Sequence, residues 1–283
     1  MEMIRRCNIM SIDVEDYFQV EAFSGSVARR DWQHYVCRVE QNTQRILDLL
    51  DEYGVKGTFF VLGWVADRFP QLVRQIVERG HEPGCHSYWH RRVHDLTPEA
   101  FREDTLRAKT AIEQAAGAAV YGYRAPSFSI TRESLWGLEL LAELGFNFDS
   151  SIYPIRHDLY GIPDANRGPF RILTKSGPIL EFPLATFRVW GGPNMPVAGG
   201  GYLRLCPYWY TKAGLRSAWR EFLPVVSYIH PWELDPEQPR VRAPFGSRVR
   251  HYTNLKKTES RLRKLLSFDR FTSFRDCGLM EML

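Results

Sequence analysis

The chain has 283 residues, 44% of them hydrophobic, and a formal net charge of +4 at pH 7. This length fits one large domain or one domain with an appendage, and the composition is ample for a buried core. Because acidic and basic residues are mostly interspersed, the charge gives no reason to expect nucleic-acid binding. No apolar run approaches the roughly 20 residues that a membrane-spanning helix needs.

The cysteines and the N-terminal residues bear on the cellular compartment. The five cysteines are scattered without a CxxC pair, so we expect reduced thiols and no disulfide framework at Cys7, Cys37, Cys85, Cys206 and Cys277. The N-terminal sequence MEMIRRCNIMSIDVED has too few apolar residues before its acids to form the core of a signal peptide. We therefore expect a soluble, cytoplasmic protein.

Short apolar runs alternate with amphipathic helical stretches, which is typical of βα units around a parallel sheet. In the first half of the chain we predict strands at Asn8–Val14, Gly57–Leu62, His81–Cys85, Val120–Tyr123 and Phe146–Phe148. Between them we predict helices at Val39–Tyr53, Trp64–Arg79, Pro98–Ala116 and Arg132–Leu144. Thr97 is the expected N-cap of the third helix.

The rhythm changes between Tyr153 and Leu205, where proline and glycine are frequent and the β-like runs Phe170–Leu173 and Ile179–Phe182 are short. We interpret this segment as a loop and hairpin region folded over the mouth of a barrel. The βα pattern then resumes with a helix at Tyr208–Phe222 and a strand at Val225–Ile229. Residues 252–266 are predicted to form a basic helix.

Side chains that can bind a metal, transfer a proton or hold a carboxylate follow five of the predicted strands. They are Asp13, Glu15 and Asp16 at the first strand, then His86, Arg124, Asp149 and His230. In parallel α/β folds the carboxyl ends of the strands meet at one rim, which hosts the active site. Residues far apart in the sequence should therefore converge there.

His86 and His90 are four residues apart in the sequence HSYWH. On one helical turn both imidazoles would lie on the same side and reach one metal ion. A zinc protease would need glutamate directly after the first histidine, where this chain has Ser87. The alternative is an accidental spacing, but the position after the glycine-marked Gly84–Cys85 strand favours a metal site.

The acidic cluster offers a base and a ligand. Strand alternation places Asp13 and Glu15 on one face, with Asp16 just beyond. Two such carboxylates can divide the work of binding a metal and taking a proton from water. The alternative is a solvated acidic loop, which suits Asp16 better than Asp13 because Asp13 lies within an apolar strand.

The remaining motifs carry weaker signals. The Arg124 guanidinium could hold a carboxylate by paired hydrogen bonds, with Pro126 stiffening the turn. Asp149 could equally be an ordinary loop residue. His230 follows a buried strand and precedes a proline, which suits a general acid, although a core histidine is the alternative reading.

The order of these motifs resembles the five motifs of the polysaccharide deacetylase family (carbohydrate esterase family 4, the NodB-homology domain). The resemblance runs from about Ile9 to Trp232 and is strongest for the cytoplasmic branch with peptidoglycan-deacetylase-like and allantoinase-like proteins. The sequences SIDVEDYFQVEAF, GGGYLRL and YIHPWELDPEQP are similar to deacetylases encoded with exopolysaccharide and exosortase systems. Those proteins carry a poorly characterised C-terminal region.

The resemblance implies an α/β fold: a distorted, incomplete (β/α) barrel of the polysaccharide deacetylase type, with a loop and hairpin insertion and a basic C-terminal helix. We expect the barrel at residues 1–183 and 207–235, and the family-specific C-terminal region at 184–206 and 236–283. The implied activity is metal-dependent hydrolysis of the N-acetyl group of an amino sugar, releasing acetate.

The resemblance also implies roles for individual residues. Asp13 would be the general base, oriented by Arg124, and His230 the general acid, while His86 and His90 would bind a divalent metal, most simply Zn²⁺. The common family motif has two adjacent aspartates, but Val14 follows Asp13 here, so the third ligand would be Glu15 or Asp16, with Glu15 preferred. The implied substrate-binding residues are Pro126, Ser127, Asp149, Ser151 and Trp232.

The expected partner is an N-acetylated carbohydrate, as a polysaccharide or as a lipid- or nucleotide-linked precursor. The basic stretch at residues 240–264 could contact anionic lipid, with a solvated helix face as the alternative. Two other functions fit the same fold, namely hydrolysis of a small amide or ureide in the manner of allantoinase, and catalytically silent carbohydrate binding.

Overall fold

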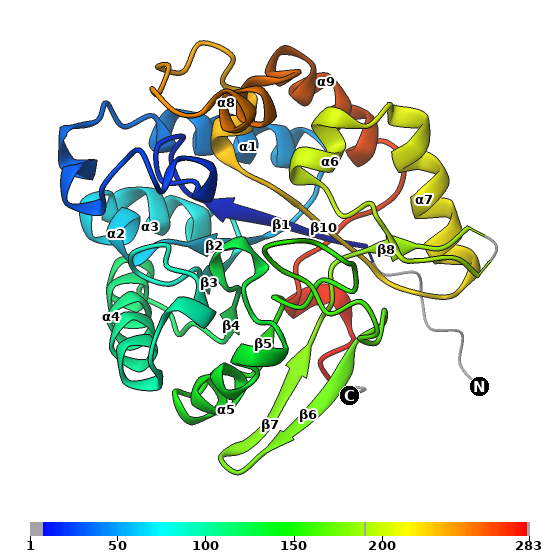
Figure 1. Ribbon diagram of the computed structural model, residues 1–283, viewed down its shortest axis with the longest axis horizontal. Coiled ribbons are helices and arrows are strands. Elements are labelled where there is room, and N and C mark those ends of the chain that lie inside the picture. The colour runs from blue at the N-terminus through cyan, green and yellow to red at the C-terminus, as the bar shows by residue number, and fades with distance from the viewer. Residues whose placement is uncertain (1–7, 190, 282–283) are drawn as a thin grey trace.

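The computed structural model describes residues 8–189 and 191–281. Its main strands are β1 (Asn8–Val14), β2 (Thr58–Val61), β3 (Glu82–Cys85), β4 (Gly122–Tyr123), β5 (Phe148–Asp149), β6 (Phe170–Thr174), β7 (Gly177–Glu181) and β10 (Val225–Ile229). Among the described residues these eight strands form one curled sheet in the order β10-β1-β2-β3-β4-β5-β7-β6 (Figure 1). All neighbours are parallel except β6 and β7. The predicted α/β half-barrel is confirmed.

The strands at the centre of the sheet are apolar because both of their faces are covered. Every residue of β1 and β2 is buried. Ile12 of β1 pairs with Phe59 of β2 on one side and with Ile229 of β10 on the other. Continuous apolar runs of this kind are typical of parallel sheets with helices on their faces. The predicted positions of these three strands agree with the structure to within a residue.

The described residues also form the helices α1 (Val39–Glu52), α2 (Gly63–Arg68), α3 (Pro70–Glu78), α4 (Pro98–Ala116), α5 (Trp136–Glu143), α6 (Gly200–Leu205), α7 (Tyr208–Arg220), α8 (Phe245–Tyr252) and α9 (Leu255–Leu266). In Figure 1, α2 to α5 follow their strands around the outside of the sheet, and α6 to α9 gather on the side of β10. The predicted N-cap of α4 is confirmed, since Thr97 Oγ1 accepts the backbone N–H of Ala100 at 3.2 Å.

Three helix predictions need correction. The single helix predicted over residues 64–79 is two helices, because Pro70 cannot continue α2 and begins α3 instead. The helix predicted from Arg132 starts with a 3-10 turn, and its α-helical part begins at Trp136. The basic helix predicted over residues 252–266 is α9 and begins only at Leu255, because Asn254 before it has a left-handed φ of 59°.

The hairpin prediction was right about the strands and wrong about their place. β6 and β7 pair antiparallel as expected, but β7 also pairs parallel with β5, Phe148 lying opposite Leu180. The hairpin therefore extends the main sheet and does not fold over the barrel mouth. The remaining strands, β8 (Thr186–Phe187) and β9 (Met195–Pro196), form a separate pair. The expected division into barrel and C-terminal region stays a prediction.

The C-terminal segment packs back against the sheet. Thr272 forms an isolated parallel bridge with Ile9 at the start of the first strand. The Phe274 ring lies between 4.9 and 5.9 Å from the rings of Phe60, Phe148 and Phe182. These contacts fill the sheet interior near the end where β1 begins.

Two predictions from composition can be compared with the described part of the chain. No disulfide joins any two of its cysteines, Cys37, Cys85, Cys206 and Cys277, whereas Cys7 and the two arginines before it lie outside the described residues. None of the described helices combines the length and the apolar character needed to cross a bilayer.

Candidate active site

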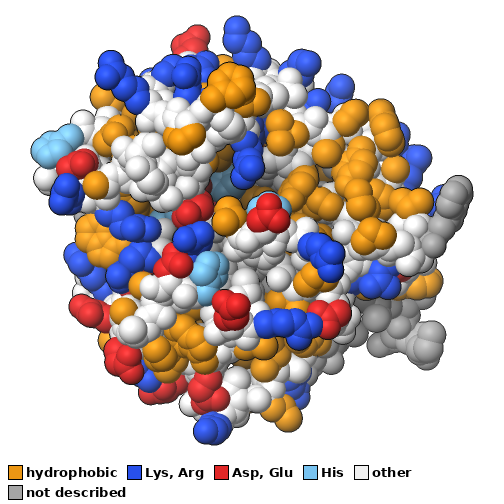
Figure 2. Space-filling view, in the orientation of Figure 1, with side chains coloured by type: hydrophobic (Ala, Val, Ile, Leu, Met, Phe, Trp, Pro, Cys, Tyr) orange, Lys and Arg blue, Asp and Glu red, His pale blue; other side chains and the backbone are white. Residues whose placement is uncertain are grey.

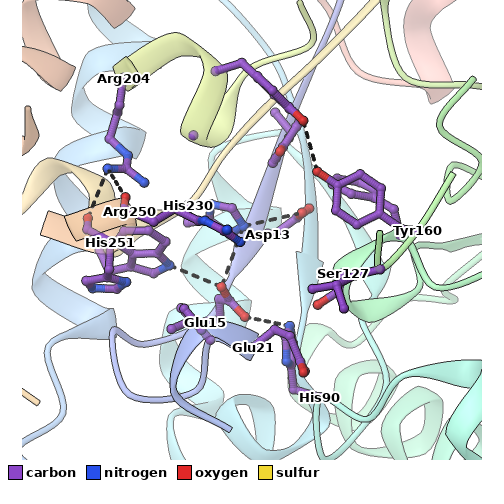
Figure 3. A pocket seen from close by; sticks show the side chains of 18 of the residues that line it. Asp13, Glu15, Glu21, His90, Ser127, Tyr160, Arg204, His230, Arg250 and His251 are labelled. Carbon is purple, nitrogen blue, oxygen red and sulfur yellow. Dashed lines mark hydrogen bonds and ion pairs between the residues drawn. The ribbon is translucent and has the colours of Figure 1, made fainter. Parts of the chain in front are cut away.

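A cavity of about 500 Å³ lies at the carboxyl ends of β1, β3 and β10. Figure 2 shows a hollow near the middle of this face, with charged side chains at its rim and hydrophobic ones toward α6 and α7. Predicted site residues line the cavity from the ends of these three strands and of β4: Asp13, Glu15, His86, His90, Ser127, His230 and Trp232. Figure 3 shows Asp13, Glu15, His90, Ser127 and His230 around it. Such a volume is typical of small-ligand sites.

The two predicted metal histidines converge, but not on a helical turn. Residues 86–90 form an irregular loop after β3, in which Ser87 and His90 have left-handed φ values of 63° and 50°. Ser87 Oγ accepts the backbone N–H of His90 at 3.0 Å and stabilises this loop. The imidazole rings of His86 and His90 face one cavity with their centroids 5.3 Å apart. The prediction of a helical turn was therefore wrong.

Among the described residues, Glu15, His86 and His90 form the only group of three histidine, cysteine or carboxylate side chains close enough together to bind one metal ion. Their candidate ligand atoms all lie within 4.8 Å of one another, and all three side chains are buried. His86 Nδ1 lies 2.8 Å from the carbonyl oxygen of Arg124, which leaves Nε2 for the cluster. A hydrogen-bonded second ring nitrogen is the usual arrangement of a metal-binding histidine.

The carboxylate of this cluster has one unsatisfied oxygen. Glu15 Oε2 lies 2.9 Å from His90 Nε2, but the two groups are not oriented for a hydrogen bond, and this oxygen has no hydrogen-bond partner. A buried carboxylate oxygen without a donor costs free energy unless a cation satisfies it. Two imidazoles and one carboxylate are also the protein ligands of many catalytic zinc sites. The residues therefore fit a divalent ion.

The electrostatics of the cluster favour the ligand forms of its side chains. Burial alone raises the pKa of Glu15, but the imidazoles of His90, His230 and His86 outweigh burial and lower this pKa to about 2. Burial lowers the pKa of His86 to about 4. At neutral pH, Glu15 is therefore a carboxylate and His86 a neutral imidazole, the forms that bind a metal.

Asp16, the alternative third ligand, is turned away from this cluster. Its Oδ2 accepts the backbone N–H groups of Arg38 and Val39 at 2.6 and 3.0 Å, and its Oδ1 accepts that of Tyr17 at 2.9 Å. The carboxylate thus caps the start of α1. Burial raises its pKa to about 6. Of the two candidates, the structure brings only Glu15 to the histidines.

Asp13 and Arg124 lie side by side at the end of β1. Arg124 Nη1 donates to Asp13 Oδ1 at 2.8 Å and to Ser11 Oγ at 2.7 Å. The same guanidinium donates to the carbonyl and hydroxyl oxygens of Ser150 and is fully buried. Four such bonds fix the guanidinium, and the guanidinium in turn fixes Asp13. Asp13 Oδ2 remains on the side of the cavity.

His230 faces Asp13 and Glu15 across the cavity. Its Nε2 lies 3.9 Å from Asp13 Oδ2 and 3.6 Å from Glu15 Oε1, while its Nδ1 lies 2.7 Å from Glu233 Oε1. Burial lowers the pKa of His230, but its hydrogen bond to Glu233 and the nearby carboxylates outweigh burial and raise this pKa to about 9. At neutral pH the imidazole therefore carries a proton that it can donate toward the cavity.

Comparison with known proteins assigns the two halves of the chain. A family model described as polysaccharide deacetylase matches residues 33–148, and a domain of unknown function, DUF3473, matches residues 150–278. A peptidoglycan-N-acetylglucosamine deacetylase of Bacillus cereus is 34% identical over 98 residues, which are 34% of this chain and 36% of that protein. Residues 33–148 of the chain therefore match the polysaccharide deacetylase family, and residues 150–278 match DUF3473.

Other relatives agree with this family assignment. A chitooligosaccharide deacetylase of Sinorhizobium fredii is 38% identical over 85 residues, which are 30% of this chain and 40% of that protein. The matches therefore span less than half of either curated relative. A Mycobacterium smegmatis protein described as a polysaccharide deacetylase has a TM-score of 0.66 at 20% identity, covering 98% of this chain and 89% of that one. An allantoinase has a TM-score of 0.64 at 15% identity, covering 98% and 90%. These two structures share the deacetylase fold.

Of the five residues that the resemblance assigned to substrate binding, the structure brings two to the cavity. Ser127 and Trp232 line the cavity. Pro126, Asp149 and Ser151 are buried outside it. Ser151 Oγ donates to Asp149 Oδ1 at 2.6 Å and accepts the backbone N–H of Ala125, the residue before Pro126, at 2.8 Å. These three residues stabilise the turn that carries Arg124.

Sequence reasoning missed Glu233, which contacts His230 from outside the cavity, and several residues of the DUF3473 half that line the cavity. Glu233 carried a usable signal, because it follows His230 by three residues, the spacing of a capping box, and its side chain accepts the His230 backbone N–H at 3.1 Å. No local signal existed for Tyr160, Tyr202 or Arg204. Tyr160 reaches the cavity from a loop, and Tyr202 and Arg204 reach it from α6, whose two initial glycines argued against a helix.

Proposed function

We propose that this chain is a metal-dependent hydrolase that removes the N-acetyl group of an N-acetylated amino sugar and releases acetate. One observation carries the proposal: Asp13, His230 and the cluster of Glu15, His86 and His90 all line a single cavity. Metal, base and acid are the three components that amide hydrolysis needs. The names of the two curated relatives described above, a peptidoglycan-N-acetylglucosamine deacetylase and a chitooligosaccharide deacetylase, support the same reaction.

The proposed metal is zinc, held by Glu15, His86 and His90. Two imidazoles and a carboxylate suit zinc, and the unsatisfied Glu15 Oε2 supports a cation at this point. When bound, the ion supplies a Lewis acid for the acyl oxygen and makes a nearby water more acidic. Trp232 Nε1 donates to Glu15 Oε1 at 3.1 Å and so orients the carboxylate ligand.

Asp13 and His230 carry the proton transfers in this proposal. Asp13, held by Arg124, takes a proton from the attacking water through its cavity-facing Oδ2. His230 then donates its Nε2 proton to the leaving amine nitrogen, so that acetate and the free amino sugar depart. Asp13 Oδ2 and His230 Nε2 lie 3.9 Å apart, so both groups can reach one acetamide bound in the cavity.

The substrate-binding wall is aromatic and comes mostly from the DUF3473 half. Tyr160, Tyr202 and Phe128 line the cavity, and the hydroxyls of the two tyrosines lie 3.3 Å apart. Aromatic faces with polar edges suit a sugar ring. Arg250 also lines the cavity and could pair with the phosphate of a lipid- or nucleotide-linked sugar.

Two finer parts of the proposal have different support. Contact with a membrane surface is supported by the exposed Lys256, Lys257 and Lys264 of α9, because such lysines attract anionic lipids. The second part, a role in exopolysaccharide biosynthesis in the cytoplasm, is supported by the sequence resemblance and by the scattered cysteines, which are typical of a reducing compartment.

The test is acetate release from N-acetylated chitooligosaccharides and from peptidoglycan fragments, with allantoin as the substrate of the alternative hydrolase. The zinc-loaded protein should release acetate, and Asp13→Asn and His230→Gln should each lower kcat by about 10²- to 10⁴-fold while metal content by elemental analysis stays near one ion per chain. The matched controls are Asp31→Asn and His34→Gln, the same changes at exposed positions, and these should retain full activity.

Each contrary result has a definite meaning. Full turnover in Asp13→Asn or His230→Gln would refute the proton transfers. Release of product from allantoin but not from any amino sugar would replace the substrate class. Absence of bound metal even after zinc is added would favour the catalytically silent carbohydrate-binding alternative.

A further inference from the structure

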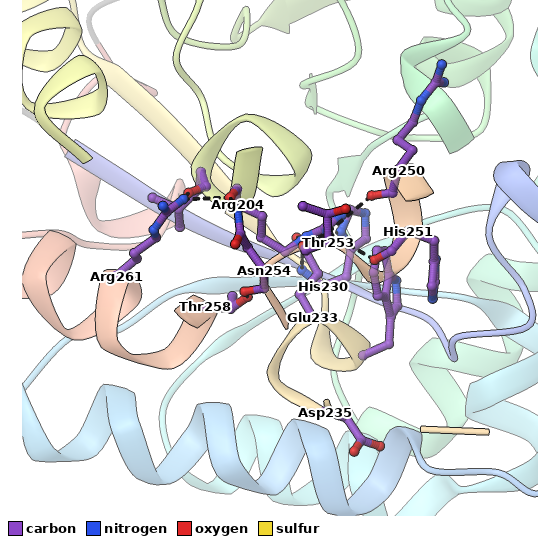
Figure 4. A network of polar contacts seen from close by, with 12 residues as sticks. Arg204, His230, Glu233, Asp235, Arg250, His251, Thr253, Asn254, Thr258 and Arg261 are labelled. Atoms are coloured by element: carbon purple, nitrogen blue, oxygen red, sulfur yellow. Dashed lines mark hydrogen bonds and ion pairs between the residues drawn. The ribbon is translucent and has the colours of Figure 1, made fainter. Parts of the chain in front are cut away.

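Arg204 is a buried arginine in the DUF3473 half, carried by the short helix α6. Its Nε donates to Glu233 Oε2 in a buried ion pair. Its Nη1 donates to the backbone carbonyls of His251 and Thr253 at 3.0 and 2.9 Å (Figure 4). The side chain therefore joins α6, the end of α8 and the segment that follows β10.

Glu233 connects this arginine to the proposed acid. It is fully buried, and while one carboxylate oxygen receives Arg204, the other lies 2.7 Å from Nδ1 of His230. The same oxygen accepts the backbone N–H of His230 at 3.1 Å. With Nδ1 engaged in this way, the ring presents Nε2 to the cavity, where Asp13 and Glu15 lie.

A buried carboxylate between two donors depends on both of them. Glu233 has no exposed surface, and its ion-pair partners among the described residues are Arg204 and His230. If the arginine were absent, the carboxylate would lose a charge-assisted hydrogen bond and become free to turn or to take up a proton. Either change would release the His230 ring.

We propose that Arg204 is a positioning residue for His230, acting through Glu233, and that the DUF3473 half thereby supplies the oriented proton donor of the site. This inference rests on the proposed function, since it assigns His230 the role of proton donor. The arrangement follows the logic of the catalytic triad, in which a buried carboxylate holds an imidazole in its working orientation. In this chain the carboxylate is itself held by an arginine from a different helix.

A purely structural role for Arg204 is the rival explanation, and Arg261 provides the matched control. Arg261 Nη1 donates to the carbonyl oxygens of Leu203, Arg204 and Cys206 at 2.6 to 2.9 Å. It therefore holds the same helix α6 through the same kind of contacts, but it does not contact Glu233. Removing Arg261 tests the attachment of α6 alone.

The first experiment measures kinetics in Arg204→Met, Arg204→Lys and Arg261→Met proteins loaded with zinc, with a chitooligosaccharide as substrate. Arg204→Met should lower kcat by about 10- to 100-fold, the usual effect of removing a group that orients an active-site histidine, with KM changed by less than about threefold and metal content unchanged. Arg204→Lys should recover part of this loss because it keeps the charge. Arg261→Met should keep kcat within about threefold. Equal losses in the two Met variants would overturn the proposal.

A second experiment needs neither substrate nor turnover. In ¹⁵N-histidine-labelled protein, the Nδ1–H proton of His230 should give a strongly deshielded resonance because it is hydrogen-bonded to a carboxylate, and the His230→Gln variant identifies this resonance. The resonance should disappear in Arg204→Met and persist in Arg261→Met. Its persistence in a folded Arg204→Met protein would overturn the proposal even if no amino sugar proves to be a substrate.

Glu233→Gln keeps the test decisive if Arg204→Met does not fold. This nearly isosteric change should itself lower kcat by at least about 10-fold, because the amide holds the imidazole poorly. In the Glu233→Gln background, Arg204→Lys should then cause little further loss, since residues that act through one network are not additive. Independent, multiplying losses would show that Arg204 does not act through Glu233.

Discussion

The metal side and the proton-donor side of the cavity are held in different ways. On the metal side, the chain enters the site directly from paired strands: His86 follows β3 and its backbone N–H donates to the carbonyl oxygen of Val61 in β2 at 2.9 Å. On the proton-donor side, His230 also follows a strand, but its ring orientation depends on Glu233 and Arg204. A backbone ladder positions His86 on the metal side, and a series of buried side chains positions the ring of His230.

This difference shows where substitutions should affect turnover. A β-ladder spreads its support over many backbone bonds, so a change far from the rim should lower stability without moving the ligands. A network of buried side chains depends on single hydrogen bonds, so one substitution in the network should disturb the proton donor. We call residues 8–148 the barrel half. We expect substitutions there to change stability and turnover separately, and substitutions in the DUF3473 half to change both together.

The largest effect is expected for Gly199→Ala in the DUF3473 half. Gly199 has φ of +137°, and a Cβ there would lie 2.0 Å from the carbonyl oxygen of Tyr228 in β10. Overpacking against backbone together with a disfavoured φ should cost roughly 3–5 kcal/mol. Because Tyr228 lies two residues before His230, kcat should fall as well, which can be measured beside the free energy of unfolding in urea.

Gly246→Ala is the control for this prediction. Gly246 lies in α8, in the same half of the chain, and no atom would approach its Cβ within 4 Å. Alanine is also the better helix former, so stability should be unchanged or higher by up to about 1 kcal/mol. A Gly199→Ala protein that lost stability but kept wild-type kcat would break the link between stability and turnover in this half.

The barrel half was readable from the sequence because its signals are local. The apolar run of β1, the proline and N-cap at the start of α4 and the strand-end position of His86 each follow from a few neighbouring residues. The parallel arrangement then implied that strand ends meet at one rim. The loop of residues 86–90 was mispredicted because left-handed φ values at Ser87 and His90 leave no mark in residue type.

The DUF3473 half was less readable because its site residues depend on tertiary contacts. Arg204 and Glu233 are 29 residues apart, and their pairing depends on α6, a helix of six residues that begins with two glycines. Tyr160 reaches the cavity from an irregular loop after β5. Neither hydrophobic periodicity nor a position at a strand end marks these residues, so their place in the site can be recognised only in the folded structure.

The second prediction concerns the pH dependence of stability in the barrel half, through His81. This histidine is buried at the start of β3, its Nδ1 accepts the backbone N–H of Gly57 at 3.1 Å, and burial lowers its pKa to about 4. A histidine with a lowered pKa contributes stability above its ordinary pKa of about 6.5 and loses that contribution as pH falls toward 4. The loss from this residue should be about 3 kcal/mol at 1.36 kcal/mol per pKa unit.

His81→Asn isolates this contribution. Asparagine can accept the Gly57 N–H through Oδ1 but cannot take up a proton, so the free energy of unfolding should fall less steeply between pH 6.5 and 4 than in the wild type. His34→Asn, an exposed change, should keep the wild-type slope. Turnover at neutral pH should be unaffected, because His81 lies at the opposite end of β3 from His86. A lower kcat in His81→Asn would contradict the separation of stability and turnover in the barrel half.

The smallest expected effect is that of Thr97→Ala at the start of α4. Loss of the N-cap hydrogen bond to Ala100 should lower the free energy of unfolding by about 1 kcal/mol, and Thr97→Ser should restore it. The metal loop should not respond, because α4 holds that loop from further along, where Asp104 accepts the backbone N–H of Tyr88 at 2.7 Å. Fraying of the first turn would stop before Asp104, so zinc content should stay at the wild-type value. Loss of zinc in Thr97→Ala would mean that the first turn of α4 positions the loop of residues 86–90. The metal side would then depend on single hydrogen bonds, as the proton-donor side does.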